Sequence, residues 1–151
     1  MTKAIDAGNM KVVVFQLADN EYVVPVSQVQ GIEKMMDITR VPNTPAHVMG
    51  VVNLRGVVTP IIDLKRLLGL EQSEITEATR IIIISSEDIN VGLIVDSAND
   101  VLDIPLEAIE PQPEVIGGVE QDFIAGVTKI EKRLLILLHL NLILLKNGKG
   151  D

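Results

Sequence analysis

Two stretches of this chain carry the same apolar pattern at a fixed spacing. Shifted by 76 positions, residues 48–68 align with residues 124–144 without a gap. The coinciding pairs are Gly50 and Gly126, Val51 and Val127, Leu54 and Ile130, Val58 and Leu134, Ile61 and Leu137, Ile62 and Leu138, and Leu64 and Leu140. Two β-rich segments can align by chance, but a gap-free register of this length favours a pseudo-symmetric molecule built from two similar copies.

The start of the chain aligns in the same way at an offset of 69. This offset places residues 12–15 on residues 81–84, and Ile32 on Val101. The second copy is therefore longer by seven residues, which we place in the proline- and glycine-rich stretch 111–118. Ile32 and Val101 are then expected at matching positions in the two copies.

The composition favours strands over helices. Apolar residues make up 47% of the chain and aromatic residues 2%, and most of the apolar residues are valine, isoleucine or leucine. Apolar runs around polar turns predict hairpins over residues 11–24, 51–62, 81–95 and 126–138. We expect further strands over residues 36–41 and 101–104. Short helices are predicted over residues 27–32, 44–47, 64–68 and 139–145.

Each copy then holds roughly five short strands, and a small sheet of that size avoids exposed edges best by closing on itself. The predicted fold is mainly β, with two small five-stranded β-barrel lobes of SH3- or OB-like type, pseudo-symmetry and few short helices. We expect one domain over residues 11–150, with strands exchanged between lobes near residues 15–25 and 135–145. Residues 1–10 and 146–151 are expected to be flexible tails. A groove between the lobes is a natural place for a partner to bind.

Charge and composition exclude several classes of protein. The net charge is −8, which disfavours nucleic-acid binding, and the absence of cysteine excludes disulfides and thiol chemistry. The start of the chain lacks the apolar core of a signal peptide, and the apolar run 134–145 is too short to cross a bilayer. We therefore expect a cytoplasmic protein. Residues 81–128 contain ten acidic residues and no lysine or arginine, which fits either a solvated face or a surface that steers a basic partner.

Sequence motifs for catalysis and cofactor binding are weak. The chain has no nucleotide-binding glycine loop, and its two histidines, His47 and His139, are too far apart in sequence to suggest a metal site. Asp63 and Asp96 each follow an apolar strand and could form a carboxylate pair for acid–base chemistry, but helix capping and strand ending explain them better. No cofactor is expected. Arg55 stands out at a predicted hairpin tip, where its guanidinium could make a bidentate contact.

Four segments of the chain resemble the CheW family of bacterial chemotaxis coupling proteins. They are residues 41–45 (VPNTP), 50–64 (GVVNLRGVVTPIIDL), 91–96 (VGLIVD) and 100–102 (DVL). The resemblance runs from about Lys11 to Leu145, in the right order. It implies two five-stranded β-barrel lobes and a non-enzymatic adaptor. Such an adaptor joins the cytoplasmic tips of chemoreceptors to the regulatory domain of the histidine kinase CheA, at receptor arrays beneath the inner membrane.

The resemblance also implies which residues touch the partners. By matching position, Val29, Ile32 and Val101 would supply apolar contacts to the receptor tip and Arg55 a polar one. Kinase contacts carry over to the segment containing Ile38 and Thr39, to Gly50, and to a second-lobe loop with Glu110, Glu114 and Val115. This chain departs from some relatives, because Glu110 stands where a basic residue can occur and Val115 where an aromatic one can. Gly31 occupies a place near Arg55 where an acidic residue often sits.

We therefore interpret the chain as a chemotaxis adaptor that belongs to a two-component signalling system and binds neither nucleic acid nor the membrane interior. Three alternatives stay open at this point. The chain could be a paralogue or truncated coupling regulator of another pathway, a small hydrolase using Asp63 and Asp96, or an OB-like nucleic-acid binder. The acidic balance and the few aromatic residues disfavour the last of these.

Overall fold

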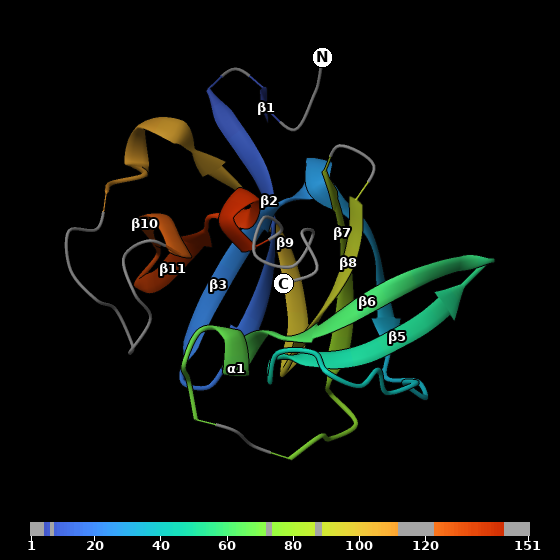
Figure 1. Ribbon diagram of the computed structural model, residues 1–151. Helices are drawn as coiled ribbons and strands as arrows, with labels where there is room; N and C mark the ends of the chain where they lie inside the picture. The colour runs from blue at the N-terminus through green and yellow to red at the C-terminus, as the bar shows by residue number, and fades with distance from the viewer. Residues whose placement is uncertain (1–4, 7, 72–73, 87–88, 112–122, 144–151) are drawn as a thin grey trace.

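The computed structural model describes residues 5–6, 8–71, 74–86, 89–111 and 123–143 (Figure 1). Within these residues the protein consists of two sheets. The first sheet contains β1 (Ile5–Asp6), β2 (Asn9–Leu17), β3 (Asn20–Pro25), β9 (Ser97–Pro105), β10 (Ile124–Ile130) and β11 (Arg133–Leu138). The second sheet contains β4 (Val29–Lys34), β5 (Val48–Leu54), β6 (Val57–Asp63), β7 (Arg80–Ser86) and β8 (Ile89–Val95). The short helices are η1 (Val26–Gln28), α1 (Leu64–Leu67), η2 (Leu106–Ala108) and a turn over residues 140–143.

The strand order shows the same pattern in both sheets. The first sheet runs β9-β2-β3-β11-β10, with β1 added on β2, and the second runs β4-β7-β8-β6-β5. In each sheet one parallel pair, β3 with β11 or β6 with β8, joins two antiparallel hairpins. The bounds of β10 follow those of β5 at an offset of 76, and β11 begins at the same offset from β6. The predicted pseudo-symmetry is confirmed.

Each sheet takes strands from both copies of the repeat. The first sheet combines β2 and β3 from the start of the chain with β9, β10 and β11 from its second half, and the second sheet combines the remaining strands. Within the described residues the chain crosses between sheets at η1, which separates β3 from β4, and at Asp96, which separates β8 from β9. A lobe of this protein is therefore a sheet, and each sheet is built from both sequence copies.

The expected closed five-stranded barrels need correction. The ladders are open among the described residues, with β4 and β5 at the edges of the second sheet and β9 and β10 at those of the first. A single isolated bridge spans each opening, Thr39 to Val51 in the second sheet and Glu110 to Val127 in the first. The first sheet has six strands because Ile5 and Asp6, in the segment expected to be a tail, pair with Met10 and Asn9.

Three other local predictions were wrong. Residues 27–32 form the end of η1 and then strand β4, because Val29 and Ile32 pair with Ile84 and Ile82 of β7. This ladder outweighs a weak helical preference in a β-branched segment. In residues 36–41 the strand is reduced to the Thr39 bridge, and residues 44–47 form a turn in place of a helix.

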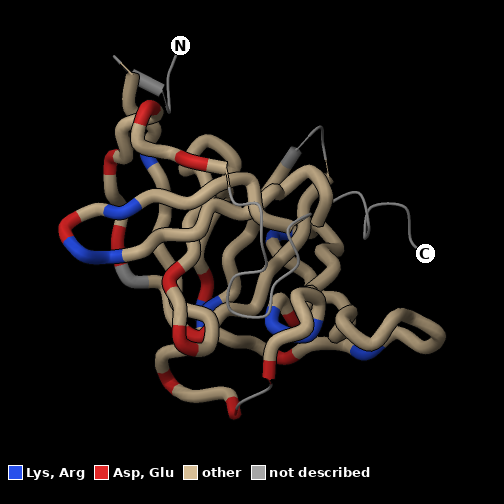
Figure 2. Tube along the Cα trace, turned by 90° about the vertical axis from the view of Figure 1, so that its left-hand side faces the viewer, with Lys and Arg blue, Asp and Glu red and all other residues tan. Residues whose placement is uncertain are grey.

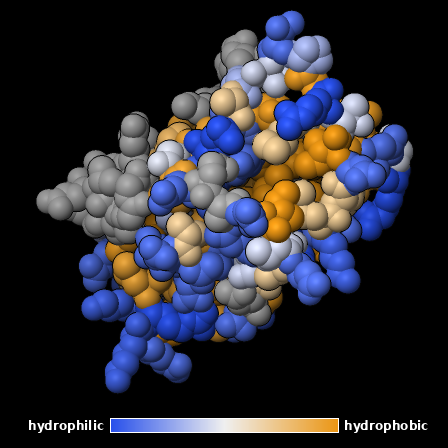
Figure 3. All heavy atoms as spheres, turned by 90° about the horizontal axis from the view of Figure 1, so that it is seen from below, coloured by the Kyte–Doolittle hydropathy of each residue, from blue (hydrophilic) through white to orange (hydrophobic). Residues whose placement is uncertain are grey.

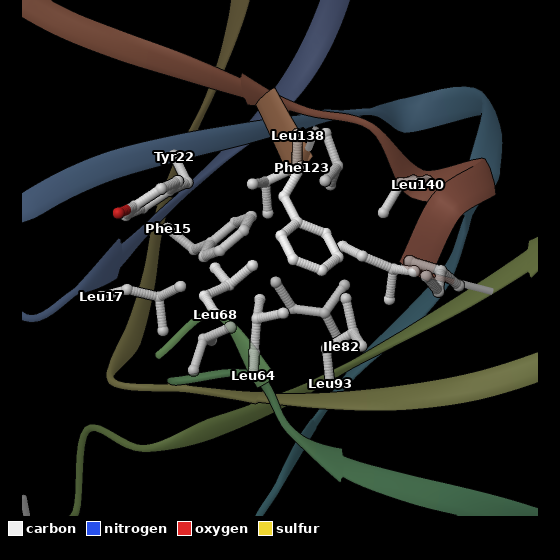
Figure 4. Packing of buried hydrophobic residues seen from close by; sticks show 14 of the residues in the cluster. Phe15, Leu17, Tyr22, Leu64, Leu68, Ile82, Leu93, Phe123, Leu138 and Leu140 are labelled. Atoms are coloured by element: carbon white, nitrogen blue, oxygen red, sulfur yellow. The ribbon is translucent and has the colours of Figure 1, made fainter. Parts of the chain in front are cut away.

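Three apolar clusters hold the two sheets. The largest, which we call the shared core, lies between the sheets and draws on both (Figure 4). Its residues include Phe15, Tyr22, Leu64, Leu68, Ile82, Leu93, Phe123, Leu138 and Leu140. Each sheet also has a smaller interior cluster of its own, around Val12 and Val14 in the first and around Ile81 and Ile83 in the second. The expected groove between the lobes is therefore filled at its centre, and only the rim of this layer is exposed.

Candidate protein-interaction site

Val29, Ile32 and Val101 lie on the face of their sheets that looks toward the other sheet. Residues directly opposite on paired strands project to the same face. Val29 and Ile32 pair with Ile84 and Ile82, and Val101 pairs with Val13. All three pairing partners are buried in the shared core: Val13, Ile82 and Ile84.

These three residues nevertheless remain accessible, because β4 and β9 are edge strands. Ile32 is 42% exposed and Val101 is 54% exposed, whereas Val29 is half-buried against the shared core. We call Val29, Ile32 and Val101 the inter-sheet rim. The structure thus gives the two positions that the repeat aligned, Ile32 and Val101, equivalent surroundings in the two sheets.

Arg55 occupies the tip of the β5–β6 hairpin, which extends away from the rest of the molecule (Figure 1). Arg55 and Gly56 have φ values of 52° and 86°, as in the two-residue hairpin turns whose twist matches that of the strands. The side-chain oxygen Oδ1 of Asn53 accepts a hydrogen bond of 2.8 Å from the Gly56 N–H. The Arg55 side chain is 84% exposed, and its Nη2 lies 3.8 Å from Oε2 of Glu33.

Arg55 therefore reaches β4, but on the other face of that strand from Ile32. Glu33 pairs with Ile81, which belongs to the interior of the second sheet, whereas Ile32 pairs with a residue of the shared core. The guanidinium and the inter-sheet rim flank the same edge strand from opposite sides. A partner that contacts both must wrap around the edge of β4.

A cleft of about 170 Å³ opens beside the guanidinium. Its lining residues are Gln30, Gly31, Glu33, Leu54, Arg55, Val57, Thr59, Ile83 and Asn90. Gly31 offers no carboxylate here, and Glu33, two residues further along the strand on the same face, supplies it instead. Glu33 was not predicted from the sequence, because residues 27–32 were expected to form a helix and the two-residue alternation of a strand does not apply to a helix.

The candidate kinase-contact residues of the second sheet lie together where the backbone at Thr39 packs closely against β5. The N–H and carbonyl of Thr39 bond to Val51 at 2.9 and 2.8 Å. Gly50 has φ +146°, and a Cβ there would lie 2.1 Å from the Thr39 carbonyl oxygen and 2.8 Å from Cγ2 of Ile38. Ile38 is partly buried against the second sheet's own cluster. Packing therefore accounts for the residue types at Ile38 and Gly50, whereas Thr39 is exposed and contributes through its backbone.

The first sheet repeats this arrangement. Glu110 bonds to Val127 through both its backbone N–H and its carbonyl, each at 2.8 Å, and its side chain is exposed. A Cβ on Gly126 would lie 3.0 Å from the Glu110 carbonyl oxygen. The remaining candidates of this loop, Glu114 and Val115, lie outside the described residues.

Asp63 and Asp96 do not form a catalytic pair. Asp63 caps α1 by accepting the Arg66 N–H, and it also forms an ion pair with the Arg66 side chain. Oδ1 of Asp96 lies 2.7 Å from Nζ of Lys65, while its Oδ2 accepts the Ala18 N–H at 2.8 Å. Both carboxylates are committed to structural contacts, so the hydrolase hypothesis is wrong.

The backbone groups of both histidines take part in structural hydrogen bonds. The His47 carbonyl accepts the Asp63 N–H, and the His139 N–H donates to the Phe123 carbonyl, which is the same contact at an offset of 76. Among the described residues no group of three or more histidine, aspartate or glutamate side chains could hold a metal ion.

The acidic segment is partly neutralised within the molecule. Asp96, Asp100 and Asp103 form ion pairs with Lys65, Arg133 and Lys11, cations that come from outside residues 81–128. Acidic and basic residues are accordingly interspersed along the trace (Figure 2). This pairing was invisible in the sequence, because the partners are distant in the chain.

Arg133 makes the most extensive of these contacts. Its Nε and Nη2 reach Oε1 and Oε2 of Glu21 at 3.1 and 2.9 Å, and Nη2 also lies 3.3 Å from Asp100. The hydrogen bonds and the charge of Arg133 hold the pKa of the Glu21 carboxyl below its ordinary value. The same contacts raise the pKa of the Arg133 guanidinium. This cluster ties β11 to β3 and β9 across the first sheet.

Comparison with known proteins assigns the family. The CheW-like domain family matches residues 11–147. The chain is 47% identical to the chemotaxis protein CheW of Bacillus subtilis over 98% of this chain and 94% of that protein. It is 30% identical to protein PilI of Pseudomonas aeruginosa over 81% of this chain and 68% of that protein.

A solved structure agrees with this result. The scaffolding protein TtCheW of Thermoanaerobacter tengcongensis matches with a TM-score of 0.86 and 35% identity, covering 93% of this chain and 96% of that one. In the part of the chain that the structure describes, no helix is long and apolar enough to span a membrane. On the agreement of sequence and fold, the chain belongs to the CheW-like family, a family of non-enzymatic chemotaxis scaffolds.

Proposed function

We propose that this protein couples the cytoplasmic tips of chemoreceptors to the regulatory domain of the histidine kinase CheA, acting in the cytoplasm at receptor arrays. The observation that carries the proposal is the inter-sheet rim. Ile32 and Val101 stand at matched positions of two pseudo-symmetric sheets and are held accessible by edge strands, with Val29 half-buried beside Ile32, and a helical partner needs such a surface in order to contact both sheets together.

The chemistry of the rim fits an apolar, helical ligand. Ile32 and Val101 supply branched aliphatic surface, and removing that surface from water on binding is favourable. Arg55 adds a guanidinium that can donate hydrogen bonds to a carboxylate of the partner, because its contact with Glu33 is long and solvent-exposed. Affinity then resides in the rim, and the guanidinium sets the register of the partner.

The kinase would bind elsewhere. We propose that its regulatory domain contacts the segment with Ile38 and Thr39, the neighbourhood of Gly50, and the loop with Glu110, Glu114 and Val115. In support, the Arg40–Met49 segment forms a second exposed hollow of about 430 Å³ beside Thr39. Seen from below, an apolar area lies on the side that carries the β5–β6 hairpin in Figure 1 (Figure 3).

Capture of a receptor fragment tests the proposal. We expect Arg55→Ala and Val101→Asp to weaken capture of a receptor-tip fragment without changing the circular dichroism spectrum. Leu134→Asp is the matched control, since Leu134 is 39% exposed on the first sheet but lies outside the rim. If the folded Arg55→Ala and Val101→Asp variants capture the fragment as well as the wild type does, the rim is not the receptor site.

Kinase coupling is tested separately by ATP turnover. The protein is mixed with CheA and receptor fragment, complexes are sedimented, and ATP hydrolysis is measured. We expect turnover to depend on this chain and to fall with Val101→Asp. The alternative is a coupling protein of another signalling pathway, and recovery of a different histidine kinase with the protein from its own cells would favour it.

A further inference from the structure

An ion pair between a buried lysine and a partly buried aspartate, which is 29% exposed, lies at a crossing of the chain between the two sheets. Asp96 separates β8 of the second sheet from β9 of the first. Its carboxylate lies 2.7 Å from Nζ of Lys65, in α1, the helix that directly follows β6 of the second sheet. The Lys65 side chain is only 7% exposed. A cation of the second sheet is therefore buried against the residue where the chain leaves that sheet.

The same carboxylate also holds the first sheet. Oδ2 of Asp96 accepts the N–H of Ala18, in the turn between β2 and β3, at 2.8 Å. The backbone N–H of Asp96 donates to the Gln16 carbonyl at 3.0 Å. One carboxylate oxygen thus contacts the helix that follows β6 of the second sheet, and the other contacts the turn between β2 and β3 of the first sheet.

The other crossing lacks these charges. Under the offsets of the repeat, Ser27 corresponds to Asp96 and Asn141 corresponds to Lys65. Both Ser27 and Asn141 are neutral, and both are exposed. The two crossings are equivalent in topology, yet only one of them carries an ion pair with a buried lysine.

We propose that Lys65 is a positioning residue that fixes the relative orientation of the two sheets through Asp96. The apolar shared core holds the sheets together but is non-directional, whereas a short charged hydrogen bond in a buried site has a defined geometry. Val101 lies on β9, which begins directly after Asp96, and Ile32 lies on β4, which follows the other crossing. The ion pair therefore sets where one half of the inter-sheet rim stands relative to the other.

Spin-label distances test the orientation directly. The chain has no cysteine, so Val58→Cys and Lys129→Cys place one label on an exposed position of each sheet. We expect a single narrow distance distribution in the otherwise unchanged protein. Lys65→Met should broaden it about twofold or shift its maximum, because the sheets lose their directional contact. Arg66→Met, at a half-exposed neighbour in α1, is the matched control and should leave the distribution narrow.

A double variant covers the case in which Lys65→Met does not fold. Lys65→Met with Asp96→Asn removes both charges, so no charge is left buried without a partner, while the amide oxygen can still accept the Ala18 N–H. We expect this variant to fold and to give a broad distribution. A distribution as narrow as in the unchanged protein, in this variant or in folded Lys65→Met, overturns the proposal.

The effect of Lys65 on receptor binding rests on the proposed function. It is measured by capture of the receptor-tip fragment, separately from the spin-label distances. We expect Lys65→Met, which lies away from the rim, to weaken capture of the receptor-tip fragment at least about fivefold, since a mobile rim must be ordered on binding. A broadened distribution with unchanged capture would leave the orienting role in place and count against the rim as the receptor site. An unchanged distribution would count against the orienting role alone.

Discussion

The β5–β6 hairpin and the β10–β11 hairpin are copies of each other, yet the arginines at their tips make different contacts. Both turns hold two residues at positive φ, Arg55 and Gly56 in one and Glu131 and Lys132 in the other. The first tip keeps its arginine 84% exposed, with one contact of 3.8 Å. The second hairpin begins its return strand with Arg133, which bonds to Glu21 through two nitrogens and also reaches Asp100.

This difference separates a tip available to a partner from one fixed within its own sheet. Val57 and Val58, which follow the first turn, are 49% and 64% exposed. Their equivalents at an offset of 76 are Arg133 and Leu134, and the arginine side chain is engaged by two carboxylates. Arg133 therefore supports the fold within its own sheet, whereas the exposed Arg55 is available to a partner.

The largest expected difference between the copies is at their matched glycines. Gly50→Ala should destabilise the protein by more than about 3 kcal/mol, because its Cβ would overlap the Thr39 carbonyl at a φ of +146°. Gly126→Ala should cost about 1–2 kcal/mol, since its nearest neighbour at 2.7 Å is a side-chain methyl of Ile109 that can move. Urea denaturation measures both, and equal losses would contradict the comparison.

The two arginines should differ next. Arg133→Met is expected to lower the free energy of unfolding by about 1–2 kcal/mol, because it leaves Glu21 partly buried without its bidentate partner. Arg55→Met should change it by less than about 0.5 kcal/mol, as for other exposed pairs. The same urea titrations compare them. A larger loss for Arg55→Met than for Arg133→Met would reverse our assignment of the two tips.

Low pH should weaken the contact between Glu21 and Arg133 and so lower the free energy of unfolding. The folded-state pKa of Glu21 is lowered from its ordinary value of 4.5, so its contribution to stability is present above that value and is lost as the pH falls through the lowered pKa. Glu21→Gln should flatten the decline in stability between pH 5 and 3. Arg133→Met should flatten it similarly, and combining the two substitutions should add little. Independent effects of the two substitutions would mean that their contact does not control this decline.

The smallest effect concerns the turns themselves. Lys132 holds a φ of 72°, a conformation that costs little for glycine but strains other residues. Lys132→Gly should therefore stabilise the protein by about 0.5 kcal/mol, and Gly56→Lys should destabilise the other turn by a similar or larger amount. Thermal melting monitored by circular dichroism resolves the sign. A destabilising Lys132→Gly would show that the lysine side chain holds the turn in another way.

Local sequence patterns predicted the hairpins and α1 but not the structure that depends on distant strand pairing. The turns at Arg55 and at Glu131 were visible because polar pairs interrupt apolar runs, and α1 was visible because Asp63 precedes it and Gly69 follows it. The choice between helix and strand in residues 27–32 was missed, because pairing with the distant strand β7 decides it. Glu33 was missed for the same reason.

The sequence by itself determined the repeat, the strand-forming segments, the family motifs and the matched positions of Ile32 and Val101. These features depend on residues that are near one another or that align at a fixed offset. Only the tertiary structure decided that each sheet takes strands from both copies, that Arg133 is held while Arg55 is exposed, and that Lys65 is buried against Asp96. Ion pairs and sheet neighbours depend on distances in space between segments far apart in the chain, and two copies with nearly the same local pattern can differ in them.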